Sequence, residues 1–242
     1  RLQGDWSSDV CSSDLMDPEV QERLRQITER VTPASADVDV TFEGFSLHVA
    51  RGVFNPARGR STRKMLNAMR LIPLTEGERV LEIGTGCGVL SLFAWQATQT
   101  LPVALDIAPE ALACAKINFD RHNMPVDPRP SDLFSALSPE MGRFNVVIFN
   151  APTAHPEIRD DNPALGTVWD ATCSLKQRFA EQVGRYLTPT GRAYMMYAVY
   201  RDHDSLAPID FTGYDVHKLF VEHDAVSESG VIVMTRSPQP QL

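Results

Sequence analysis

The residues best suited to chemistry lie in the segment from 80 to 90, which reads Val-Leu-Glu-Ile-Gly-Thr-Gly-Cys-Gly-Val-Leu. Gly84, Gly86 and Gly88 follow a short apolar run and precede a helical pattern, so the chain must turn sharply and can let a ligand approach its backbone. The spacing differs from the dinucleotide fingerprint G-x-G-x-x-G, because the third glycine comes one residue early. Glu82, just before the glycines, is a second departure. The segment predicts a ligand-binding turn and disfavours a nicotinamide cofactor.

Two more acids lie at places where strands are expected to end. Asp106 comes 18 residues after Gly88, and a carboxylate there can accept hydrogen bonds from both hydroxyls of a ribose. Asp132 comes where the next strand should end, and its carboxylate can accept a hydrogen bond from an adenine amino group. A solvated loop would explain any one of these acids. Together with Glu82 they place three acids at consecutive strand ends, which predicts a nucleoside site.

These residues resemble the cofactor motifs of class I S-adenosylmethionine-dependent methyltransferases, in the pattern Glu82-x-Gly84-x-Gly86-x-Gly88, Asp106 and Asp132-Leu133. The resemblance covers nearly all of the chain from about residue 50 onward. It implies S-adenosyl-L-methionine as the cofactor, with the three glycines near its methionine part. It also implies that Asp106 holds the ribose, that Asp132 holds the adenine and that Glu82 fixes the loop or the methionine ammonium. The complete set of implied cofactor-binding residues is Glu82, Gly84, Thr85, Gly86, Gly88, Asp106, Ile107, Asp132, Leu133 and Asn150.

A second motif, Asn-Ala-Pro-Thr at residues 150–153, follows an apolar run at 144–149. It resembles the Asn-Pro-Pro-aromatic motif of the small-domain methyltransferases, a group that includes the release-factor glutamine N-methyltransferases. The side-chain oxygen of Asn150 and the backbone carbonyl of Ala151 can hold both N–H groups of a planar amine or amide. This would position the nitrogen for in-line attack on the cofactor methyl group. The ring of Pro152 would hold the shape of the loop.

The second motif departs from the family pattern at two positions. Ala151 replaces the first proline, and Thr153 replaces the aromatic residue. Because that ring stacks on a flat acceptor, its loss disfavours a nucleobase substrate. His155 is either a general base for an O–H or N–H acceptor or a structural histidine before Pro156. The predicted catalytic residues are therefore Asn150, Ala151, Pro152 and His155.

The elements before the glycine segment follow from the periodicity of the apolar residues. Asp17-Pro18-Glu19 is a helix start, and apolar residues three or four apart predict a helix up to Val31. Two alternating runs over 38–49, joined by Glu43-Gly44, predict a β-hairpin. A further helix is predicted from about Ser61 to Pro73.

Strands and helices alternate beyond residue 78. Strands are predicted at 80–83, 101–105, 144–149, 192–197, 214–220 and 230–235, and helices after 88, from 109 and over 172–187, the last ended by a turn at 188–191. Such alternation predicts an open, mostly parallel sheet with ligands at the carboxyl ends of its strands. The expected fold class is therefore α/β, a Rossmann-like class I methyltransferase sheet preceded by an N-terminal helix and β-hairpin.

Three regions are predicted along the chain. Residues 5–15 resemble a translated sequencing adapter, so 1–15 is interpreted as an adapter-derived tail, with a genuine N-terminal arm as the alternative. Residues 16–59 would form the N-terminal helix and hairpin, and 60–242 the methyltransferase domain. Met16 is either a true start or an internal residue, which leaves open whether a substrate domain precedes it.

The acidic balance of the chain disfavours nucleic acid as a partner. The net charge is −8 for all 242 residues and −6 without residues 1–15, whereas a nucleic-acid footprint normally shows as a basic face. A local exception is either a solvated surface or a patch facing phosphate or carboxylate, and it comprises Arg51, Arg58, Arg60, Arg63 and Lys64.

Cysteine usage and hydropathy point to a cytoplasmic protein without a membrane partner. Cys87, Cys114 and Cys173 lack the spacing of metal ligands, which predicts reduced thiols and no metal site. No apolar run reaches the roughly 18 residues that a membrane span needs, and no signal peptide is recognised.

The leading hypothesis is an S-adenosylmethionine-dependent methyltransferase that N-methylates an amide or amine of a protein side chain or a small molecule. One alternative is O- or N-methylation of a small metabolite, using His155 or proximity alone. A nicotinamide-dependent oxidoreductase and a catalytically silent cofactor-binding or partner protein are alternatives of other classes. The identity of the acceptor and the oligomeric state stay open.

Overall fold

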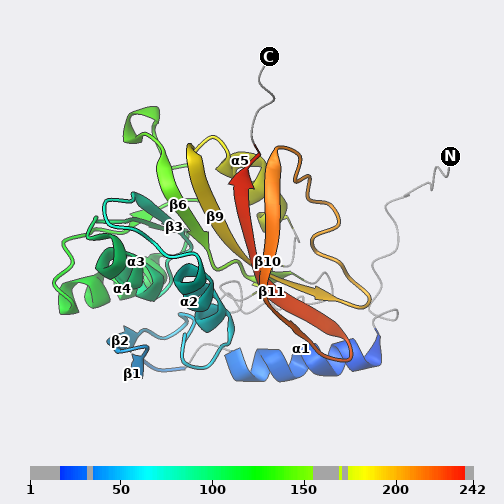
Figure 1. Ribbon diagram of the computed structural model, residues 1–242. Helices are drawn as coiled ribbons and strands as arrows, with labels where there is room; N and C mark the ends of the chain where they lie inside the picture. The colour runs from blue at the N-terminus through cyan, green and yellow to red at the C-terminus, as the bar shows by residue number, and fades with distance from the viewer. Residues whose placement is uncertain (1–16, 32–34, 155–168, 171–173, 238–242) are drawn as a thin grey trace, which may run out of the picture.

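The computed structural model describes residues 17–31, 35–154, 169–170 and 174–237. Its centre is a sheet of seven strands in the order β10-β11-β9-β6-β3-β4-β5 (Figure 1). The parallel strands are β3 (Val80–Ile83), β4 (Val103–Asp106), β5 (Arg129–Pro130), β6 (Phe144–Phe149) and β9 (Leu187–Tyr200). At one edge, β10 (Tyr214–His223) and β11 (Ser227–Arg236) add an antiparallel pair, with β11 next to β9. The predicted α/β fold class is confirmed.

The order of the strands reverses beside β3, and this reversal locates the ligand site. The chain runs from β3 through β4 to β5 on one side, then crosses back to lay β6 and β9 on the other. In open α/β sheets, ligands bind at the carboxyl ends of the strands where the order reverses. The segments after β3 and β6 therefore flank the expected crevice.

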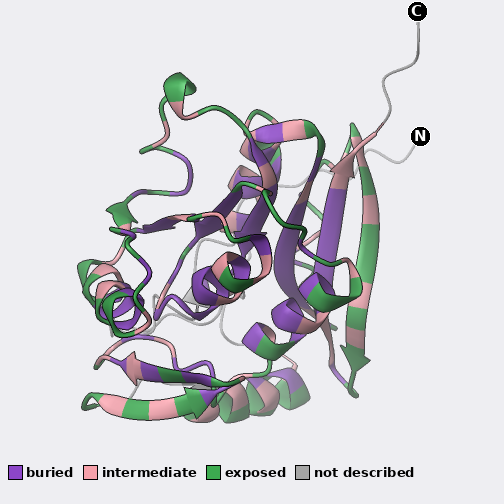
Figure 2. Ribbon diagram, turned by 60° about the vertical axis from the view of Figure 1, so that its left-hand side comes forward, coloured by how far each residue is buried: buried purple, intermediate pink, exposed green. Residues whose placement is uncertain are grey.

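Helices cover both faces of the sheet, so most residues of its central strands are buried (Figure 2). One face is covered by α2 (Ser61–Leu71), α3 (Val89–Thr98) and α4 (Pro109–Arg121), and the other by α5 (Leu175–Val183). Side chains of a strand alternate between its two faces. In β6, Val146 and Ile148 pack toward the first face, while Val147 and Phe149 pack toward α5.

The N-terminal helix α1 (Pro18–Val31) runs beneath the sheet, at the end where the parallel strands terminate (Figure 1). Its start is capped as predicted, because the Asp17 carboxylate accepts a hydrogen bond of 2.9 Å from the Glu19 N–H. The apolar stripe packs on the carboxyl end of β9 and on Val226, through Val20 and Leu24. Burial of this stripe fixes the helix over the crevice.

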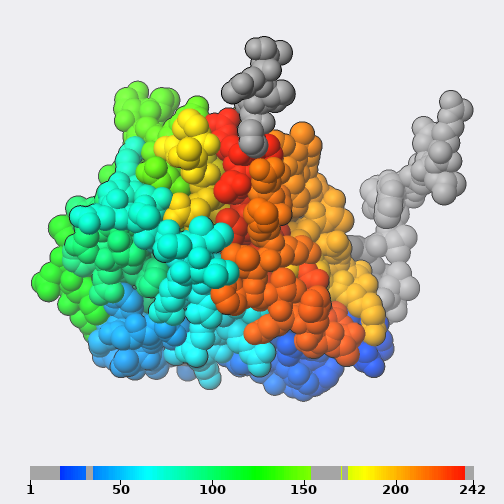
Figure 3. Space-filling model, in the orientation of Figure 1, coloured from blue at the N-terminus to red at the C-terminus, as the bar shows by residue number. Residues whose placement is uncertain are grey.

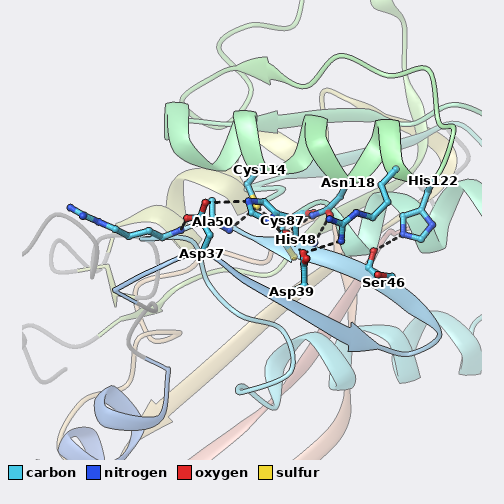
Figure 4. A network of polar contacts seen from close by, with 11 residues as sticks. Asp37, Asp39, Ser46, His48, Ala50, Cys87, Cys114, Asn118 and His122 are labelled. Carbon is cyan, nitrogen blue, oxygen red and sulfur yellow. Dashed lines mark hydrogen bonds and ion pairs between the residues drawn. The ribbon is translucent and has the colours of Figure 1, made fainter.

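The predicted hairpin consists of β1 (Val38–Phe42) and β2 (Phe45–Val49), which pair with Phe42 opposite Phe45. Several side chains of the α4 region contact the hairpin, and one of them, Asn118, also reaches the glycine turn (Figure 4). The side-chain oxygen of Asn118 accepts from the His48 N–H at 2.7 Å, and its amide donates to the carbonyls of His48 and Cys87 at 2.7 and 2.8 Å. The hairpin thus supports the turn after β3 from behind.

One predicted boundary is wrong. The segment 188–191 was expected to be a turn after a helix ending at 187, but α5 ends at Val183 and β9 already begins at Leu187. The pairing of β6 with β9 jumps from Phe144–Leu187 to Val146–Arg192, so the extra residues bulge within the strand. Turn-forming residues therefore produced an irregularity inside a strand.

Two short strands were not among the predicted elements, whereas the strand expected to end at Asp132 is present as β5. The two are β7 (Thr153–Ala154) and β8 (Trp169–Asp170), each two residues long, and they pair in parallel. Runs this short carry no readable alternation. Among the helices of the described residues, none is both long enough and apolar enough to cross a membrane.

Candidate functional site

A cavity of about 680 Å³ opens at the carboxyl ends of the parallel strands. That size is typical of a small-molecule site. Most of the predicted site residues line it, namely Glu82, Gly84, Thr85, Gly86, Asp106, Ile107, Asp132, Leu133, Asn150, Ala151 and Pro152. Gly88 is not among the lining residues, and His155 lies outside the described residues.

Glu82, on β3, is almost completely buried beneath the glycine turn. Its carboxylate accepts a hydrogen bond of 2.9 Å from the Thr85 hydroxyl and another from the Ser91 hydroxyl of α3. Burial disfavours the charged form and raises the pKa of this carboxyl to about 8, with the nearby charge of Asp106 adding to the effect. Glu82 therefore ties the two ends of the turn together from inside.

Gly86 and Gly88 both have positive φ, of 54° and 83°, which favours glycine. A Cβ atom on Gly86 would meet nothing within 4 Å, whereas one on Gly88 would lie 2.4 Å from the Cε1 atom of Phe119 on α4. The backbone at Gly86 thus faces open space in the cavity. At Gly88 a side chain is excluded by helix packing, which is a different reason for glycine from the one that the sequence suggested.

Asp106, at the end of β4, faces the turn across the crevice. Its carboxylate accepts hydrogen bonds from the Gly86 N–H at 2.9 Å and from the Ala108 N–H at 3.0 Å. Burial raises the pKa of Asp106, and these backbone donors oppose the increase. The bond to Gly86 joins the β3 and β4 ends into one rigid floor.

Asp132, just after β5, is about half exposed and already paired. Its carboxylate lies 2.6 Å from the Arg178 guanidinium of α5, and both residues line the cavity. Asp132, the residue predicted to bind the adenine, is therefore also paired with Arg178, which the sequence analysis did not single out. The neighbouring Leu133 also lines the cavity and adopts a φ of 48°.

Asn150 follows β6 and lines the cavity between the predicted cofactor-binding residues, which follow β3, β4 and β5, and the part of the cavity beside β9. Its amide nitrogen donates a 3.5 Å hydrogen bond to the Thr62 hydroxyl of α2. Its side-chain oxygen Oδ1 is buried and has no hydrogen-bond partner within the described part of the chain. A buried acceptor without a partner is costly, so this oxygen is a natural position for a ligand donor.

Two residues that the sequence analysis missed lie beside the loop after Asn150. The buried Lys176 of α5 donates a 2.8 Å hydrogen bond from Nζ to the Pro152 carbonyl. Asp170 lines the cavity, and its carboxylate accepts a 2.8 Å hydrogen bond from the Leu175 N–H at the start of α5. A signal was available for Lys176, because it interrupts an apolar stripe with Phe179, Ala180 and Val183 at helical spacing.

The basic cluster noted in the sequence is divided by the structure. Arg60 and Lys64 line the cavity, where Arg23 and Arg30 of α1 join them. Arg63 instead forms an ion pair of 3.3 Å with Glu43 of the hairpin turn. Arg51 and Arg58 are absent from the lining. Within the described residues, no group of three or more His, Cys, Asp or Glu is placed to hold a metal ion.

Comparisons with known proteins agree with this geometry. The profile of the methyltransferase small domain family matches residues 45–228. A release factor glutamine methyltransferase of Koribacter versatilis is 31% identical over 134 residues, which is 51% of this chain and 47% of the relative. A putative protein N5-glutamine methyltransferase of Methanocaldococcus jannaschii is 31% identical over 113 residues, 47% of this chain and 53% of the relative. The chain thus spans about half the length of these curated relatives.

A solved structure shows the same fold. A methyltransferase from Pyrococcus furiosus superposes with a TM-score of 0.55 at 18% identity, covering 90% of this chain and 99% of that one. At this identity the likeness concerns the fold alone. The family match extends from the hairpin through the glycine turn and Asn150 to β11, so the chain belongs to the methyltransferase small domain family of S-adenosylmethionine-dependent enzymes.

Proposed function

We propose that the protein transfers a methyl group from S-adenosylmethionine to an amide or amine nitrogen held by Asn150. The observation that carries this proposal is the unpartnered Asn150 Oδ1, which is buried at the carboxyl end of β6 in the wall of the cavity. An acceptor N–H would satisfy it. Asn150 matches the asparagine of the Asn-Pro-Pro-aromatic motif that the small-domain methyltransferases carry after the corresponding strand.

The floor of the cavity fits an adenosyl cofactor. Gly86 leaves open space beside its backbone, and Asp106 and Asp132 follow two adjacent strands on the same side of the turn. We assign the methionine part to the glycine turn, the ribose to Asp106 and the adenine to Asp132, with Ile107 and Leu133 beside them. When bound there, S-adenosylmethionine supplies a methyl group activated by its sulfonium.

The residues of the chain contribute mainly by positioning. The Thr62 hydroxyl fixes the rotation of the Asn150 amide. Asn150 Oδ1 then accepts a hydrogen bond from one N–H of the methyl acceptor, and the Ala151 carbonyl accepts a hydrogen bond from the other. Lys176 holds the Pro152 carbonyl and so keeps the loop in shape. Holding the nitrogen in line with the transferred methyl group lowers the barrier through proximity and electrostatics.

The names of the curated relatives favour a protein side-chain amide as the acceptor. Both are named for glutamine methylation, of a release factor in one case and of a protein in the other. The chain carries Thr153 where that group has an aromatic residue, which favours an acceptor that needs no stacking partner. We further propose that the protein acts in the cytoplasm.

The second candidate is O- or N-methylation of a small metabolite, favoured by the size of the cavity and by the loss of the aromatic residue. Under that reading proximity alone, or His155 as a base, would replace the Asn150 clamp. A catalytically silent cofactor-binding protein is the third reading.

The cofactor is tested first by thermal unfolding with S-adenosylmethionine, S-adenosylhomocysteine, NAD or no ligand. At about 100 times its dissociation constant, a ligand stabilises the fold by roughly 2.7 kcal/mol. For a chain of this size we expect a midpoint rise of roughly 5–10 °C with both adenosyl compounds and none with NAD. A rise with NAD alone would reject the proposal.

The acceptor clamp is tested with Asn150→Ala and labelled S-adenosylmethionine, using protein and small-molecule fractions of a cell lysate. We expect the variant to lose methyl transfer by about 10²–10³-fold, the cost of removing one well-placed polar group. Its affinity for S-adenosylhomocysteine should change by less than about threefold. Asn67→Ala on α2, outside the cavity lining, is the matched control. Full activity of Asn150→Ala would favour the proximity-only mechanism, and labelling of the small-molecule fraction alone would favour the second candidate.

A further inference from the structure

The half of the cavity away from the glycine turn is lined by four cations. Arg23 and Arg30 come from α1, Arg60 from the loop before α2, and Lys64 from α2 itself. We call these residues the basic cluster of the cavity. They lie beside the β9, β11 and β10 ends of the sheet, where Glu222, Ser227 and Ser229 complete the wall.

Three of the four cations have partners in the chain. Lys64 Nζ lies 2.9 Å from both the carbonyl and the hydroxyl of Ser229, and 3.2 Å from the Glu222 carboxylate. The same carboxylate lies 3.4 Å from Arg60, which is two-thirds exposed. Arg23 pairs with Asp224 at 2.7 Å, and this contact joins α1 to the β10–β11 end, where the space-filling view shows them packed together (Figure 3).

Arg30 differs, because none of the ion pairs of the described residues includes it. Its Nε, like that of Arg23, is buried without a hydrogen-bond partner in that part of the chain. Burial lowers the pKa of Arg30, and the positive charges of Arg60 and Arg23 lower it further. A merely solvated arginine keeps its guanidinium in water, whereas here a buried donor has no acceptor, which is costly.

The charges of the cluster do not balance. Among the described residues, the four cations form ion pairs with two carboxylates, those of Glu222 and Asp224. An additional anion would neutralise the excess and give Arg30 an acceptor. Planar guanidinium groups match carboxylate and phosphate oxygens well, because two parallel N–H donors meet two oxygens.

The position of the cluster favours the methyl acceptor over the cofactor as the source of that anion. Asn150 follows β6, and the next strands in order are β9, β11 and β10. Strands lie about 4.8 Å apart, so β11 is about 14 Å from β3, where the glycine turn begins. The reacting nitrogen at Asn150 would lie between the cofactor and the cluster.

We propose that the basic cluster binds a carboxylate or phosphate group of the methyl acceptor, with Arg30 as the main ligand and Arg60 as the second. This inference rests on the proposed function, since it takes the cavity to be the acceptor site. The cations line a cavity and not a broad basic face, so the group that they bind is a compact anion carried by the acceptor, not a nucleic-acid strand.

The test uses the whole chain saturated with S-adenosylhomocysteine and titrated with inorganic phosphate, glutarate or uncharged glutaramide at constant ionic strength. Wild type should bind phosphate, glutarate or both, and not glutaramide; the preferred anion identifies the group. Arg30→Gln and Arg60→Gln should each weaken anion binding at least tenfold. Arg25→Gln, on the same helix but paired with Glu22 and Glu29, is the matched control and should not. Arg60 is largely exposed, so its variant folds even if Arg30→Gln does not.

Two outcomes overturn the inference. One is anion binding that is absent from wild type or equal in all four proteins. The other is that Arg30→Gln weakens S-adenosylhomocysteine but not methylthioadenosine, which lacks the amino-acid part, because the anion would then be the carboxylate of the cofactor. Repeating the anion titrations without S-adenosylhomocysteine separates the two proposals. If S-adenosylhomocysteine does not bind wild type, the proposed function fails, while these titrations still measure whether the basic cluster binds an anion.

Discussion

The cavity has a cofactor half, at the glycine turn, and an acceptor half, at Asn150 and the basic cluster. The two halves differ in how far their polar groups are hydrogen-bonded within the chain. In the cofactor half, the carboxylates of Glu82 and Asp106 already accept hydrogen bonds from hydroxyls and backbone N–H groups of the chain. In the acceptor half, Asn150 Oδ1 and Arg30 Nε are buried without partners among the described residues. The first half is organised before any ligand binds, and the second is complete only with a ligand.

This difference separates what the family shares from what an individual member recognises. The polar groups of the cofactor half are hydrogen-bonded within the chain, so the shape of this half does not depend on which methyl acceptor binds. Unpartnered buried groups destabilise the protein by about 1–3 kcal/mol each, and a matching ligand recovers that cost on binding. Substitutions in the cofactor half should therefore affect stability, whereas those in the acceptor half should affect recognition.

The largest effect on stability is expected where the cofactor half has no spare room. In Gly88→Ala, the positive φ costs about 1–2 kcal/mol, and the collision with Phe119 adds about 1–3 kcal/mol of overpacking. Gly86→Ala shares the positive φ but meets no atom, so it should lose only the first part. Urea unfolding measures both. The matched Gly86→Ala variant should instead show the larger loss of S-adenosylhomocysteine affinity, since its methyl group enters the cavity. Equal losses of stability would show that packing at Phe119 is unimportant.

A second effect, which depends on pH, is expected for Glu82→Gln. The folded protein holds the pKa of Glu82 near 8, above the ordinary value of 4.5. Between those values the unfolded chain releases a proton that the folded chain keeps, so wild type loses stability as pH rises. The glutamine variant lacks this loss and should gain stability relative to wild type from pH 5 to pH 9. Thermal midpoints of both proteins across this range measure the difference. If it stays constant with pH, Glu82 is already ionised in the folded state.

The smallest effect is expected for Arg178→Gln. The pair with Asp132 is about half exposed on both sides, and such pairs contribute about 0–1 kcal/mol. Stability should therefore change by less than about 1 kcal/mol, while the freed Asp132 carboxylate should raise S-adenosylhomocysteine affinity by about two- to threefold. Lys116→Gln, which breaks a comparable exposed pair with Asp120 outside the cavity lining, serves as control. A tenfold loss of affinity in Arg178→Gln would mean that Arg178 itself binds the cofactor.

The cofactor half could be predicted from sequence because its residues are local. Glu82 and the glycines lie in one short segment, and Asp106 and Asp132 come at the ends of the next two strands, so strand ends alone bring them together. The structure places all but Gly88 of the predicted cofactor-binding residues at the cavity; their roles stay predictions. For Gly88, the packing partner Phe119 lies on another helix, and local spacing carries no information about it.

The acceptor half was less predictable because distant segments build it. Asn150 was found through its motif, but Arg30 enters only because α1 docks on the ends of β9 and β11. The spacing of the apolar residues predicts that α1 is a helix, but it does not indicate which part of the molecule the apolar stripe contacts. Lys176 and Asp170 reach the Asn150 loop from a segment about 20 residues further along the chain, a proximity that depends on the placement of α5.

Asn118 couples the local unfolding of two segments that are distant in sequence, the hairpin and the glycine turn. If the hairpin opens, the buried Asn118 amide loses its His48 partners, and the bond to the Cys87 carbonyl loses the side chain that orients it. The hairpin and the glycine turn therefore open as one cooperative unit. A ligand seated on the turn would slow hydrogen exchange of amides in β1 and β2, although neither strand touches it.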